Sequence, residues 1–370
     1  MVLKLLVNFR ADASVQIGTG HVMRCLTLAE EFRRQGHQCR FICRAHEGHL
    51  GEFIISRGFG LDLLENPATE MPVDATNVTA HAAWLGVGWE QDAKEALEVL
   101  ARHSADWLVV DHYALDARWE REVALVVGQI LVIDDLADRD HECAVLLDQN
   151  LGREASDYDQ RVPDECIRMI GPRFALLRPE FARLRESSSP RQRNSRPQRI
   201  LISLGGVDRA NATGLVLTAL SETILPPETE LDIVMGGAAP YLEEVRQQAL
   251  QPQFKALVSV NVQDMAARMR QADFSIGAAG STSWERCCLG LPSITVILAE
   301  NQRLIGEALE KKGCAILVEE RNIAKDLSTI VNRLMSSGIE LEKLANSAEN
   351  VCDGHGCARL VTEMMRKNRL

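Results

Sequence analysis

The first 36 residues follow the order of a strand, a glycine-containing loop and a helix, which restricts the chain to folds built from βα units. Residues 2–9 form a short, mostly apolar run that suits a buried strand of a parallel sheet. Apolar side chains then recur at helical spacing, at Val22, Cys25, Leu26, Ala29 and Phe32. Gly36 follows as a helix stop. We therefore expect a parallel sheet whose first strand leads directly into a helix.

The loop between this strand and this helix carries Gly18, Gly20 and His21. Glycines let the backbone approach a ligand closely, and the free N–H groups at the start of a helix suit a phosphate. A histidine at the same point would be exposed beside the bound anion. An ordinary βα turn with a surface histidine has the same pattern, and Gly-x-Gly-His by itself favours neither interpretation.

Strand and helix patterns go on alternating through the first half of the chain. Further strands are predicted over residues 39–43, 61–64, 107–113, 130–135 and 145–148, and helices over 51–58, 88–103 and 116–126. Several of these strands end in polar residues, among them Asp111 and Asp135. Because the ligands of parallel sheets bind beyond the carboxyl ends of the strands, we expect these ends to line a site.

Residues 185–198 interrupt the pattern with serines, two prolines and four arginines, but with no large apolar residue. This composition predicts a linker, with a surface loop as the alternative. We place a first domain at residues 1–185, the linker at 186–198 and a second domain at 199–350. Residues 351–370 are expected to include a terminal helix that can pack back across the cleft between the domains.

The alternation starts again after this segment. Strands are predicted over residues 199–203, 231–237, 274–277, 292–298 and 315–318, and helices over 211–220, 264–272 and from Ser281 onward. The tail has the spacing of two helices, around residues 341–348 and 360–365. The fold class is therefore α/β, with two doubly wound, Rossmann-like domains that face each other across a cleft.

A second glycine turn stands out in this half, in the run Gly280-Ser281-Thr282-Ser283-Trp-Glu285. Glycine permits a tight turn, and the hydroxyls fall where the first helical N–H groups lack partners. A diphosphate would gain several hydrogen bonds there, and the glutamate would be placed to accept from a ribose diol. The structural alternative is a Ser or Thr helix cap with the glutamate as its capping-box partner, and the pattern favours neither.

Composition excludes several classes of function. The formal net charge of −11 and the sequence pI of about 5.4 argue against a general nucleic-acid binder, although local basic groups can still hold an anionic ligand. No apolar run reaches the ~18 residues of a membrane span, and the N-terminal stretch lacks the layout of a secretory signal. We expect a cytoplasmic protein with no stable membrane association.

The cysteines and acidic residues do not indicate a metal or a cofactor. None of the ten cysteines forms a Cys-x-x-Cys pair, so we expect reduced thiols that act as small core residues. The run from Asp134 to Asp140 is acidic enough to raise the question of a metal, but a solvated loop is the preferred interpretation. We expect neither a metal site nor a cofactor.

Several motifs, taken together and in order, resemble one family. They are residues 10–25, 109–116, 205–211, 279–290, 298–302 and 353–356. The resemblance is to the UDP-sugar hydrolases of pseudaminic acid biosynthesis, which act on UDP-2,4-diacetamido-2,4,6-trideoxy-β-L-altropyranose, and it spans essentially the whole chain. The C-terminal half also resembles the MurG-type glycosyltransferases, which share the two-domain GT-B fold.

This resemblance implies hydrolysis of a UDP-sugar to UDP and the free sugar, without a metal, by inverting attack of water at the anomeric carbon. His21 would be the general base, and a neutral imidazole suits that role. The other residues that the resemblance places at the substrate are Gly18, Gly20 and Gly205 at glycine turns, Gly280, Ser281 and Thr282 at the diphosphate, Glu285 at the ribose, Val262 at the uracil edge, and Tyr113, Asn301 and Gln302 at the sugar. Arg10 and Arg24 carry the right charge for the phosphates, but each can instead pair with an acidic neighbour.

Four nearby polar residues leave alternatives open. Asp12 either orients His21 or caps the loop. His112 and His141 are expected to be surface residues or to have their hydrogen bonds satisfied. His355 stands in a Gly-His-Gly turn and either belongs to a plain turn or touches the sugar.

Three functions fit a UDP-sugar site of this kind: a hydrolase, a MurG-like glycosyltransferase that passes the sugar to an acceptor, and a non-catalytic binding protein. MurG-type transferases usually carry a basic and apolar patch that faces the membrane. Phe9, Phe53, Ile54 and Ile55 are better explained here as strand or core residues, and the chain is acidic. UDP leaves as a stabilised anion, so hydrolysis needs one base but no acid for the leaving group. We therefore prefer the hydrolase.

Overall fold

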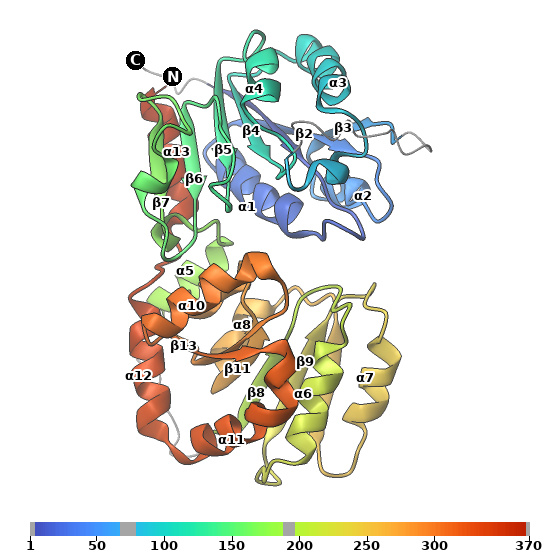
Figure 1. The fold of residues 1–370 in the computed structure, drawn as a ribbon, viewed down its shortest axis with the longest axis vertical. Helices are drawn as coiled ribbons and strands as arrows, with labels where there is room; N and C mark the ends of the chain where they lie inside the picture. Colours follow the sequence, from blue (N-terminus) through green and yellow to red (C-terminus); the bar gives the residue numbers. More distant parts are fainter. Residues whose placement is uncertain (1–3, 67–78, 188–196, 368–370) are drawn as a thin grey trace. The chain divides into compact units, whose positions relative to one another are not determined.

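The computed structural model describes residues 4–66, 79–187 and 197–367. The chain divides into two compact units, Met1–Leu176 with Gly356–Leu370, and Leu177–His355. Each unit is built on one parallel sheet with helices packed on both faces (Figure 1). The predicted α/β class and doubly wound architecture are confirmed. Residues 188–196, the centre of the predicted linker, lie outside the described residues.

The sheet of the first unit has seven strands in the order β3-β2-β1-β4-β5-β6-β7. Their bounds are β1 Leu6–Ala11, β2 Gln38–Arg44, β3 Gly60–Leu64, β4 Trp107–Asp111, β5 Gln129–Ile133, β6 Val145–Asp148 and β7 Ile167–Ile170. All neighbouring strands pair in parallel. The order reverses between β1 and β4, which is the point where ligands of such sheets bind.

Helices cover both faces of this sheet because its central strands are apolar on both sides. Trp107 and Val109 of β4 lie in the core that includes α1 (Gly20–Arg34), α2 (Gly51–Ser56) and α13 (Gly356–Lys367). Leu108 and Val110 lie in the core with α3 (Trp89–Arg102) and α4 (Ala117–Val123). A strand buried on both faces reads as a continuous apolar run, which is why the sequence predicted β4 correctly.

The sheet of the second unit has six strands in the order β10-β9-β8-β11-β12-β13, again all parallel. Their bounds are β8 Arg199–Ser203, β9 Glu230–Met235, β10 Lys255–Val260, β11 Phe274–Ala278, β12 Ser293–Ile297 and β13 Ala315–Glu319. Here the order reverses between β8 and β11. The predicted strands of this half are confirmed, and β10 was not predicted.

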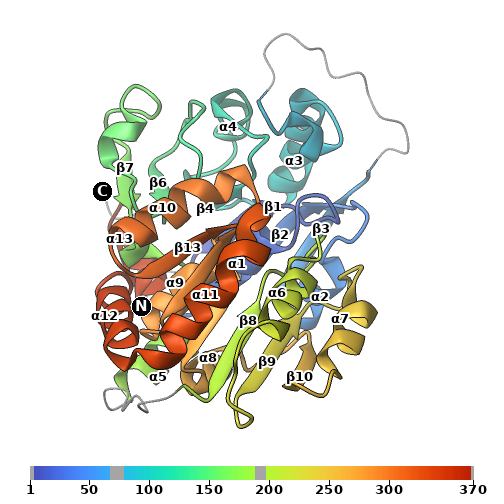
Figure 2. The same ribbon diagram turned by 60° about the horizontal axis from the view of Figure 1, so that its bottom comes forward.

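The helices of the second unit are α5 Pro179–Glu186, α6 Ala212–Ser221, α7 Leu242–Ala249, α8 Met265–Gln271, α9 Thr282–Cys288, α10 Arg303–Lys311, α11 Ile323–Ser336 and α12 Gly338–Glu349. Side chains of α6, α7, α11 and α12 form one core with the sheet, and Figure 2 shows α6 and α11 side by side. Helix α5 packs against α8 and α9. Short 3₁₀ turns include η1 (Ala82–Leu85) and η4 (Glu300–Gln302).

The division between the units differs from the predicted domain boundaries before the linker. Residues 179–185, which form most of helix α5, were placed in the first domain, but they lie in the second unit. Phe181 of this helix is fully buried, and Arg185 donates hydrogen bonds to the carbonyl oxygens of Cys288 and Glu349, both at 2.9 Å. The terminal helix α13 lies in the first unit and packs against α1. The change of unit therefore falls at residue 177, before α5, and the chain returns to the first unit at residue 356.

A buried network of ion pairs connects β1 and β2 to α3 and accounts for the burial of the Arg10 side chain. This residue lies inside β1 with no exposed surface, and two of its nitrogens hydrogen-bond Asp92 at 3.2 and 2.7 Å. Its third contact is Asp12, at 2.6 Å. Asp92 also accepts from Arg44 at 2.6 Å and from the Trp119 indole at 3.0 Å. Of the two alternatives for Arg10, pairing with acidic neighbours is the one found, and its guanidinium is not open to a ligand in this structure.

Asp12 serves this network and neither of the roles considered for it. One carboxylate oxygen accepts from Arg10 and from the backbone N–H of Arg44, at 2.6 and 2.7 Å. The other lies 3.4 Å from Nε2 of His112. Asp12 therefore joins two strands and a buried histidine, and it neither orients His21 nor caps the loop.

Asp92→Asn tests this network. Arg10 and Arg44 would stay buried while losing their shared counter-charge, so we expect the free energy of unfolding of the first unit to fall by about 3 kcal/mol. Chemical denaturation of both proteins measures this, with Glu90→Gln on the exposed side of the same helix as the control. An equal effect of the two substitutions would contradict the assignment.

The pH dependence of the same pair of proteins provides a second readout. Burial by itself raises the pKa of Asp92, but Arg10 and Arg44 together hold that pKa below its ordinary value. Its contribution to stability is therefore present above the ordinary carboxyl pKa and is lost as the pH falls through the lowered value. The stabilities of wild type and Asp92→Asn should converge in acid.

Candidate active site

Several of the predicted site residues lie at the two points where strand order reverses. In the first unit, His21 follows β1 and Tyr113 follows β4. In the second unit, Gly205 follows β8 and Gly280 follows β11. These are the carboxyl ends of adjacent central strands, where a ligand can lie between two loops.

The backbone of the β1–α1 turn adopts a conformation that favours glycine at Gly18. Gly18 has φ +82, and its backbone N–H and C=O pair with Ser14 at 2.9 and 3.3 Å. A Cβ added at Gly18 or at Gly20 would meet no atom within 4 Å, so the turn is open on that side. Helix α1 begins at Gly20 without a side-chain cap from Thr19. The prediction that this loop opens a helix at His21 is confirmed, but His21 is 7% exposed, so the expectation of an exposed histidine was wrong.

His21 is held by a carboxylate from the neighbouring strand. Its Nδ1 lies 2.6 Å from Oδ1 of Asp111, the last residue of β4, which has no exposed surface. Burial alone raises the pKa of Asp111, but the charge of Arg24 and the hydrogen bonds from Arg24 and His21 hold it well below its ordinary range. The carboxylate therefore stays ionised and accepts the Nδ1 proton. This leaves the lone pair of the imidazole on Nε2.

Arg24 fixes the same carboxylate from its other side. Its Nε and Nη2 hydrogen-bond the two oxygens of Asp111, each at 2.6 Å, in a bidentate pair. Its Nη1 reaches Asp135 at 2.7 Å. Arg24 is thus paired with acidic neighbours, and only 10% of its side chain is exposed. It acts on His21 through Asp111 and lies one helical turn after it.

Tyr113 contacts both His21 and Asp135. Its ring meets the His21 ring edge to face, with centroids 4.6 Å apart and an interplanar angle of 87°. Its hydroxyl donates to Asp135 at 2.7 Å. Burial and the nearby carboxylate raise the pKa of this phenol, so it keeps its proton. Tyr113 is buried to 7% exposure and packs directly against the candidate base.

The acidic run after β5 is buried at its start and exposed at its end, where Asp138 and Asp140 lie at the surface. Asp134 is fully buried and accepts from the backbone of Ala137 at 2.8 Å and from the Tyr158 hydroxyl at 2.9 Å. Arg139 pairs with it at 2.9 Å. The prediction of a solvated segment therefore holds for Asp138 and Asp140, but it was wrong for Asp134, because partners distant in sequence bury this aspartate. Among residues 4–66, 79–187 and 197–367, no group of three or more His, Cys, Asp or Glu side chains has a geometry for a metal ion.

His112 and His141 are both buried and each makes a contact through Nδ1, but Nε2 of each has no hydrogen-bond partner among the described residues, so neither a surface position nor full satisfaction is found. His112 accepts from the backbone N–H of Ala114 at 3.1 Å and faces Asp12. His141 has its Nδ1 2.8 Å from Glu120. In the second unit, His355 pairs with Glu186 of α5 at 2.9 Å.

The glycine turn after β8 differs from the turn after β11 in how the following helix begins. Gly205 has φ +105 and open space beside it. The N–H groups at the start of α6, however, are already taken by the side chains of Asp208 and Asn211. Helix α9 has no side-chain cap from Ser281. The capping-box alternative for this turn is therefore not what the structure shows.

A buried arginine supports the β11–α9 turn from inside the unit. Arg286 is 3% exposed and donates to the carbonyl oxygen of Ala278 at 2.8 Å and to the hydroxyls of Ser283 and Thr282 at 2.9 and 3.3 Å. Burial lowers its pKa to about 10. A Cβ on Gly277 would lie 2.4 Å from this guanidinium, so the glycine makes room for it. Gly280 has open space on its side of the turn.

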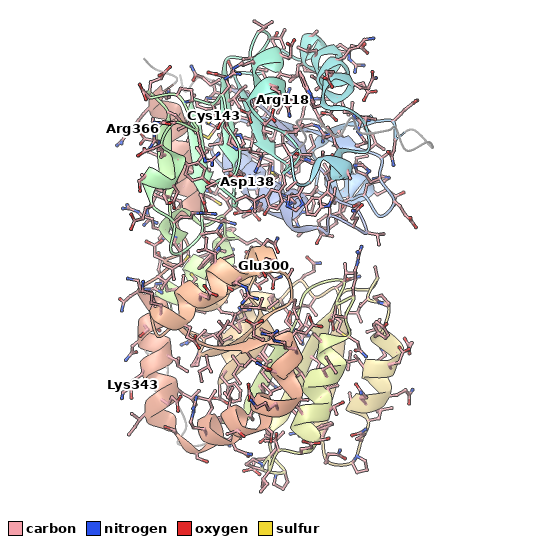
Figure 3. All side chains as sticks on the ribbon, in the orientation of Figure 1. Arg118, Asp138, Cys143, Glu300, Lys343 and Arg366 are labelled. Carbon is pink, nitrogen blue, oxygen red and sulfur yellow. The ribbon has the colours of Figure 1, made fainter. Side chains whose placement is uncertain are left out.

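Glu285 lies one turn into α9 with 17% of its side chain exposed. Arg178, which precedes α5, lies 3.8 Å from it, and burial raises the pKa of Glu285 to about 7 despite that charge. The remaining predicted residues also follow strands of this sheet. Val262 follows β10, and Asn301 and Gln302 lie in η4 after β12, where Figure 3 labels their neighbour Glu300.

Four residues of these two clusters were not assigned a role from the sequence. Asp111 and Asp135 were recognised only as polar ends of apolar strands, and that position was the available signal. The positions of Arg286 and Arg178 in the sequence gave no signal of a role, since an arginine in or before a helix is usually a surface residue.

Gly277→Ala tests the packing under the β11–α9 turn. The added methyl group would displace the buried guanidinium of Arg286, so we expect the second unit to lose about 1–3 kcal/mol of stability. Gly280→Ala is the matched control, because its Cβ would meet no neighbour and its φ is not positive. Thermal unfolding of the two variants measures the difference, and equal stabilities would contradict the packing described.

Comparison with known proteins gives consistent results. Residues 212–355 match the glycosyltransferase family 28 C-terminal domain. The chain is 27% identical over 308 residues to the UDP-2,4-diacetamido-2,4,6-trideoxy-β-L-altropyranose hydrolase of Campylobacter jejuni, a match that covers 83% of this chain and 97% of the relative. It is 30% identical over 195 residues to the spore coat polysaccharide biosynthesis protein SpsG of Bacillus subtilis, which covers 51% of this chain and 56% of that protein.

Solved structures agree on the fold. MurG from Acinetobacter baumannii has a TM-score of 0.64 at 16% identity and covers 98% of this chain and 99% of its own. UGT89C1 from Arabidopsis thaliana, complexed with UDP, has a TM-score of 0.67 at 11% identity. This match covers 98% of the present chain and 100% of UGT89C1. At these identities the likeness shows the fold alone. Within the described part of the chain, no helix is long and apolar enough to cross a membrane.

The comparisons confirm the resemblance that the motifs predicted. The chain has the GT-B fold, is similar over most of its length to the UDP-2,4-diacetamido-2,4,6-trideoxy-β-L-altropyranose hydrolase, and matches the glycosyltransferase family 28 C-terminal domain over residues 212–355 of its second unit.

Proposed function

We propose that this protein hydrolyses UDP-2,4-diacetamido-2,4,6-trideoxy-β-L-altropyranose to UDP and the free sugar, as a step of pseudaminic acid biosynthesis, without a metal or another cofactor. The observation that carries the proposal is the His21–Asp111 pair at the end of β1 and β4. The relative that matches 83% of the chain is a hydrolase of this substrate by name. The first unit supplies the base, and the second unit binds the nucleotide.

His21 is the general base of the reaction. Its Nε2 takes a proton from water while the water oxygen forms a bond to the anomeric carbon. The bond from that carbon to the diphosphate oxygen breaks on the opposite face, and UDP departs with the electron pair, so the configuration inverts. Ionised Asp111 stabilises the imidazolium that forms, and Arg24 keeps Asp111 in place.

The second unit holds the leaving group. The backbone and hydroxyls of Gly280, Ser281 and Thr282 donate to the diphosphate, at a helix start that no side chain caps. Glu285 accepts from the ribose hydroxyls, and the backbone around Val262 meets the uracil edge. The turn at Gly205 allows close approach to the nucleotide, and Asn301 and Gln302 contact the sugar. Because UDP is stable as an anion, no carboxylic acid is needed to protonate it.

In the first unit, Gly18 and Gly20 leave room for the substrate beside His21, since neither position has a neighbour within Cβ contact distance. Tyr113 borders the sugar through its ring. Arg10 is left out of the contact set because its guanidinium is buried against Asp12 and Asp92. Arg24 acts through Asp111 in this scheme and does not bind phosphate.

A transferase with the same UDP site is the alternative, favoured by the family 28 domain and by the structural likeness to MurG. It requires an acceptor before UDP is released. The two functions therefore separate in an assay that contains no acceptor.

His21→Ala tests the hydrolase. Purified wild-type protein, given the UDP-sugar in EDTA with no acceptor, should release UDP and a sugar whose first-formed anomer is inverted. Loss of the base should slow this release by about 10²–10⁴-fold, while the affinity for UDP stays unchanged. UDP release is followed by a coupled assay, the anomer by proton NMR and affinity by calorimetry.

The control for this variant is His103→Ala, a half-buried histidine at the end of α3, which should keep wild-type rates. Release of UDP only after an acceptor is added would favour the transferase. Tight binding without any turnover would favour a binding protein. Equal rates for wild type and His21→Ala would remove His21 from the mechanism.

The pH dependence of UDP affinity tests Glu285. Its pKa is raised to about 7 by burial, so the carboxyl is protonated below that pH and ionised above it. Ribose hydroxyls donate better to the ionised form, so UDP affinity should fall as the pH is lowered through about 7. Glu285→Gln should cost about tenfold in affinity at pH 8 and much less at pH 6.

The glutamine variant also serves as the control for the titration of the UDP phosphate, which remains in both proteins. Parallel pH curves for wild type and Glu285→Gln would show that Glu285 does not bind the ribose.

A further inference from the structure

Three aromatic rings gather beside the candidate base, and two of them come from a segment that the mechanism does not use. Trp84 lies nearly parallel to Tyr113, with centroids 5.7 Å apart and an interplanar angle of 24°. His81 is 4.4 Å from Trp84 and 5.3 Å from Tyr113. The centroid of Trp84 lies 6.5 Å from that of His21. The cluster is therefore continuous from η1 to the catalytic histidine.

Trp84 differs from most tryptophans of the chain in its exposure. Trp107, Trp119 and Trp284 are 0–1% exposed and fill the cores. Trp84 is only half-buried, as are His81 and Trp89. A large apolar ring that keeps surface open beside a catalytic group is available to a ligand, whereas the core tryptophans are not.

The backbone holds Trp84 firmly in this position. The next residue, Leu85, is 2% exposed and belongs to the core under α3 and α4. The 3₁₀ turn closes with a hydrogen bond from the Trp84 N–H to the His81 carbonyl at 2.9 Å and ends at Gly86, which has φ +77. Thr79 donates to the carbonyl oxygen of Ala114, beside Tyr113, at 3.5 Å. The ring is thus fixed before any ligand arrives.

His81 adds to an uncharged surface. Burial is the largest effect on its pKa and lowers it, and the charges of Arg139 and His21 lower it further. Asp138, labelled in Figure 3, acts in the opposite direction without reversing the shift. The imidazole is therefore neutral near pH 7, and this edge of the cluster carries no charge.

We propose that Trp84, with His81 beside it, is the specificity-determining wall of the sugar subsite, and that it selects UDP-sugars whose ring carries methyl groups in place of hydroxyls. The inference rests on the proposed function. A 2,4-diacetamido-2,4,6-trideoxy sugar presents three methyl groups, two on the acetamido substituents and one at C6. Each is a match for an indole face, whereas a C6 hydroxyl would lose water there without gaining a partner.

The expected discrimination is moderate. An apolar surface rejects an added hydroxyl by at most about a hundredfold, far less than a site built from hydrogen bonds does. The wall should therefore act on the sugar part of the ligand and leave binding of UDP itself unchanged.

Fluorescence quenching tests the contact directly. Of five tryptophans, Trp84 and Trp89 are the half-buried ones, so acrylamide quenching reports mainly these two. In a His21→Ala background, which limits turnover, the UDP-diacetamido sugar should protect the emission from acrylamide, and UDP alone should not. Trp84→Phe should abolish this protection. Trp89→Phe is the matched control, because that ring lies under Arg118 of α4, and it should keep the protection.

Affinities test the selectivity. In the same His21→Ala background, the protein should bind the 6-deoxy diacetamido UDP-sugar about 10- to 100-fold more tightly than UDP-N-acetylglucosamine, which carries the C6 hydroxyl. Trp84→Ala should narrow this ratio to within a few-fold while the dissociation constant of UDP stays the same. The ratio for Trp84→Phe should lie between those of the unsubstituted and the Trp84→Ala proteins. This graded change would distinguish a loss of the ring contact from misfolding.

Protection that survives in Trp84→Phe, or an equal change in affinity for UDP and for both UDP-sugars, would overturn the proposal. The failure of the proposed function has a different signature. If the UDP-sugar protects Trp84 but no UDP is released by the wild-type protein, the hydrolase assignment fails and the subsite stands. If UDP is released and Trp84 variants keep wild-type selectivity, the subsite fails and the hydrolase stands.

Discussion

The buried carboxylate of Asp111 is the interaction on which the candidate site depends. Asp111 is the last residue of β4 and has no exposed surface. Its carboxylate accepts hydrogen bonds from Nδ1 of His21 and from Nε and Nη2 of Arg24, each at 2.6 Å. An unpaired charge in this position would be very costly, so the carboxylate requires the first turn of α1 to lie where it does. The same contact sets the tautomer of His21. Fold and chemistry are therefore linked through one side chain.

The second unit has a similar buried charged side chain under its turn, but it is a cation. Arg286 is buried below the β11–α9 turn and donates to a backbone carbonyl and two hydroxyls, and Gly277 is small enough to admit it. In both units a buried charged group fixes the loop at the point where strand order reverses. Such loops are rigid before a ligand binds, so less of the binding free energy is spent on ordering them.

Much of the fold could be predicted from the sequence, because buried parallel strands are continuous apolar runs and their helices have clear spacing. The edge strands β7 and β10 were missed because most of their residues are only half-buried or exposed, Leu257 to 61%. Residues 179–185 were placed in the wrong unit because so short a segment does not show which core Phe181 enters. The site was predictable where a motif is local, as at Gly18–His21. The site could not be predicted where hydrogen-bonded partners are distant in sequence. His21 and Asp111 are 90 residues apart, and Arg10 and Asp92 are 82 residues apart.

The most direct test of the account is a double-mutant cycle on UDP release with His21→Ala and Asp111→Asn, measured on folded protein. If Asp111 acts only by orienting and stabilising His21, Asp111→Asn should slow the wild-type reaction by about 10²-fold or more and should cause no further loss in the His21→Ala background. Equal losses in the two backgrounds would show that the residues act independently, and would contradict the assignment of His21 as a base held by Asp111.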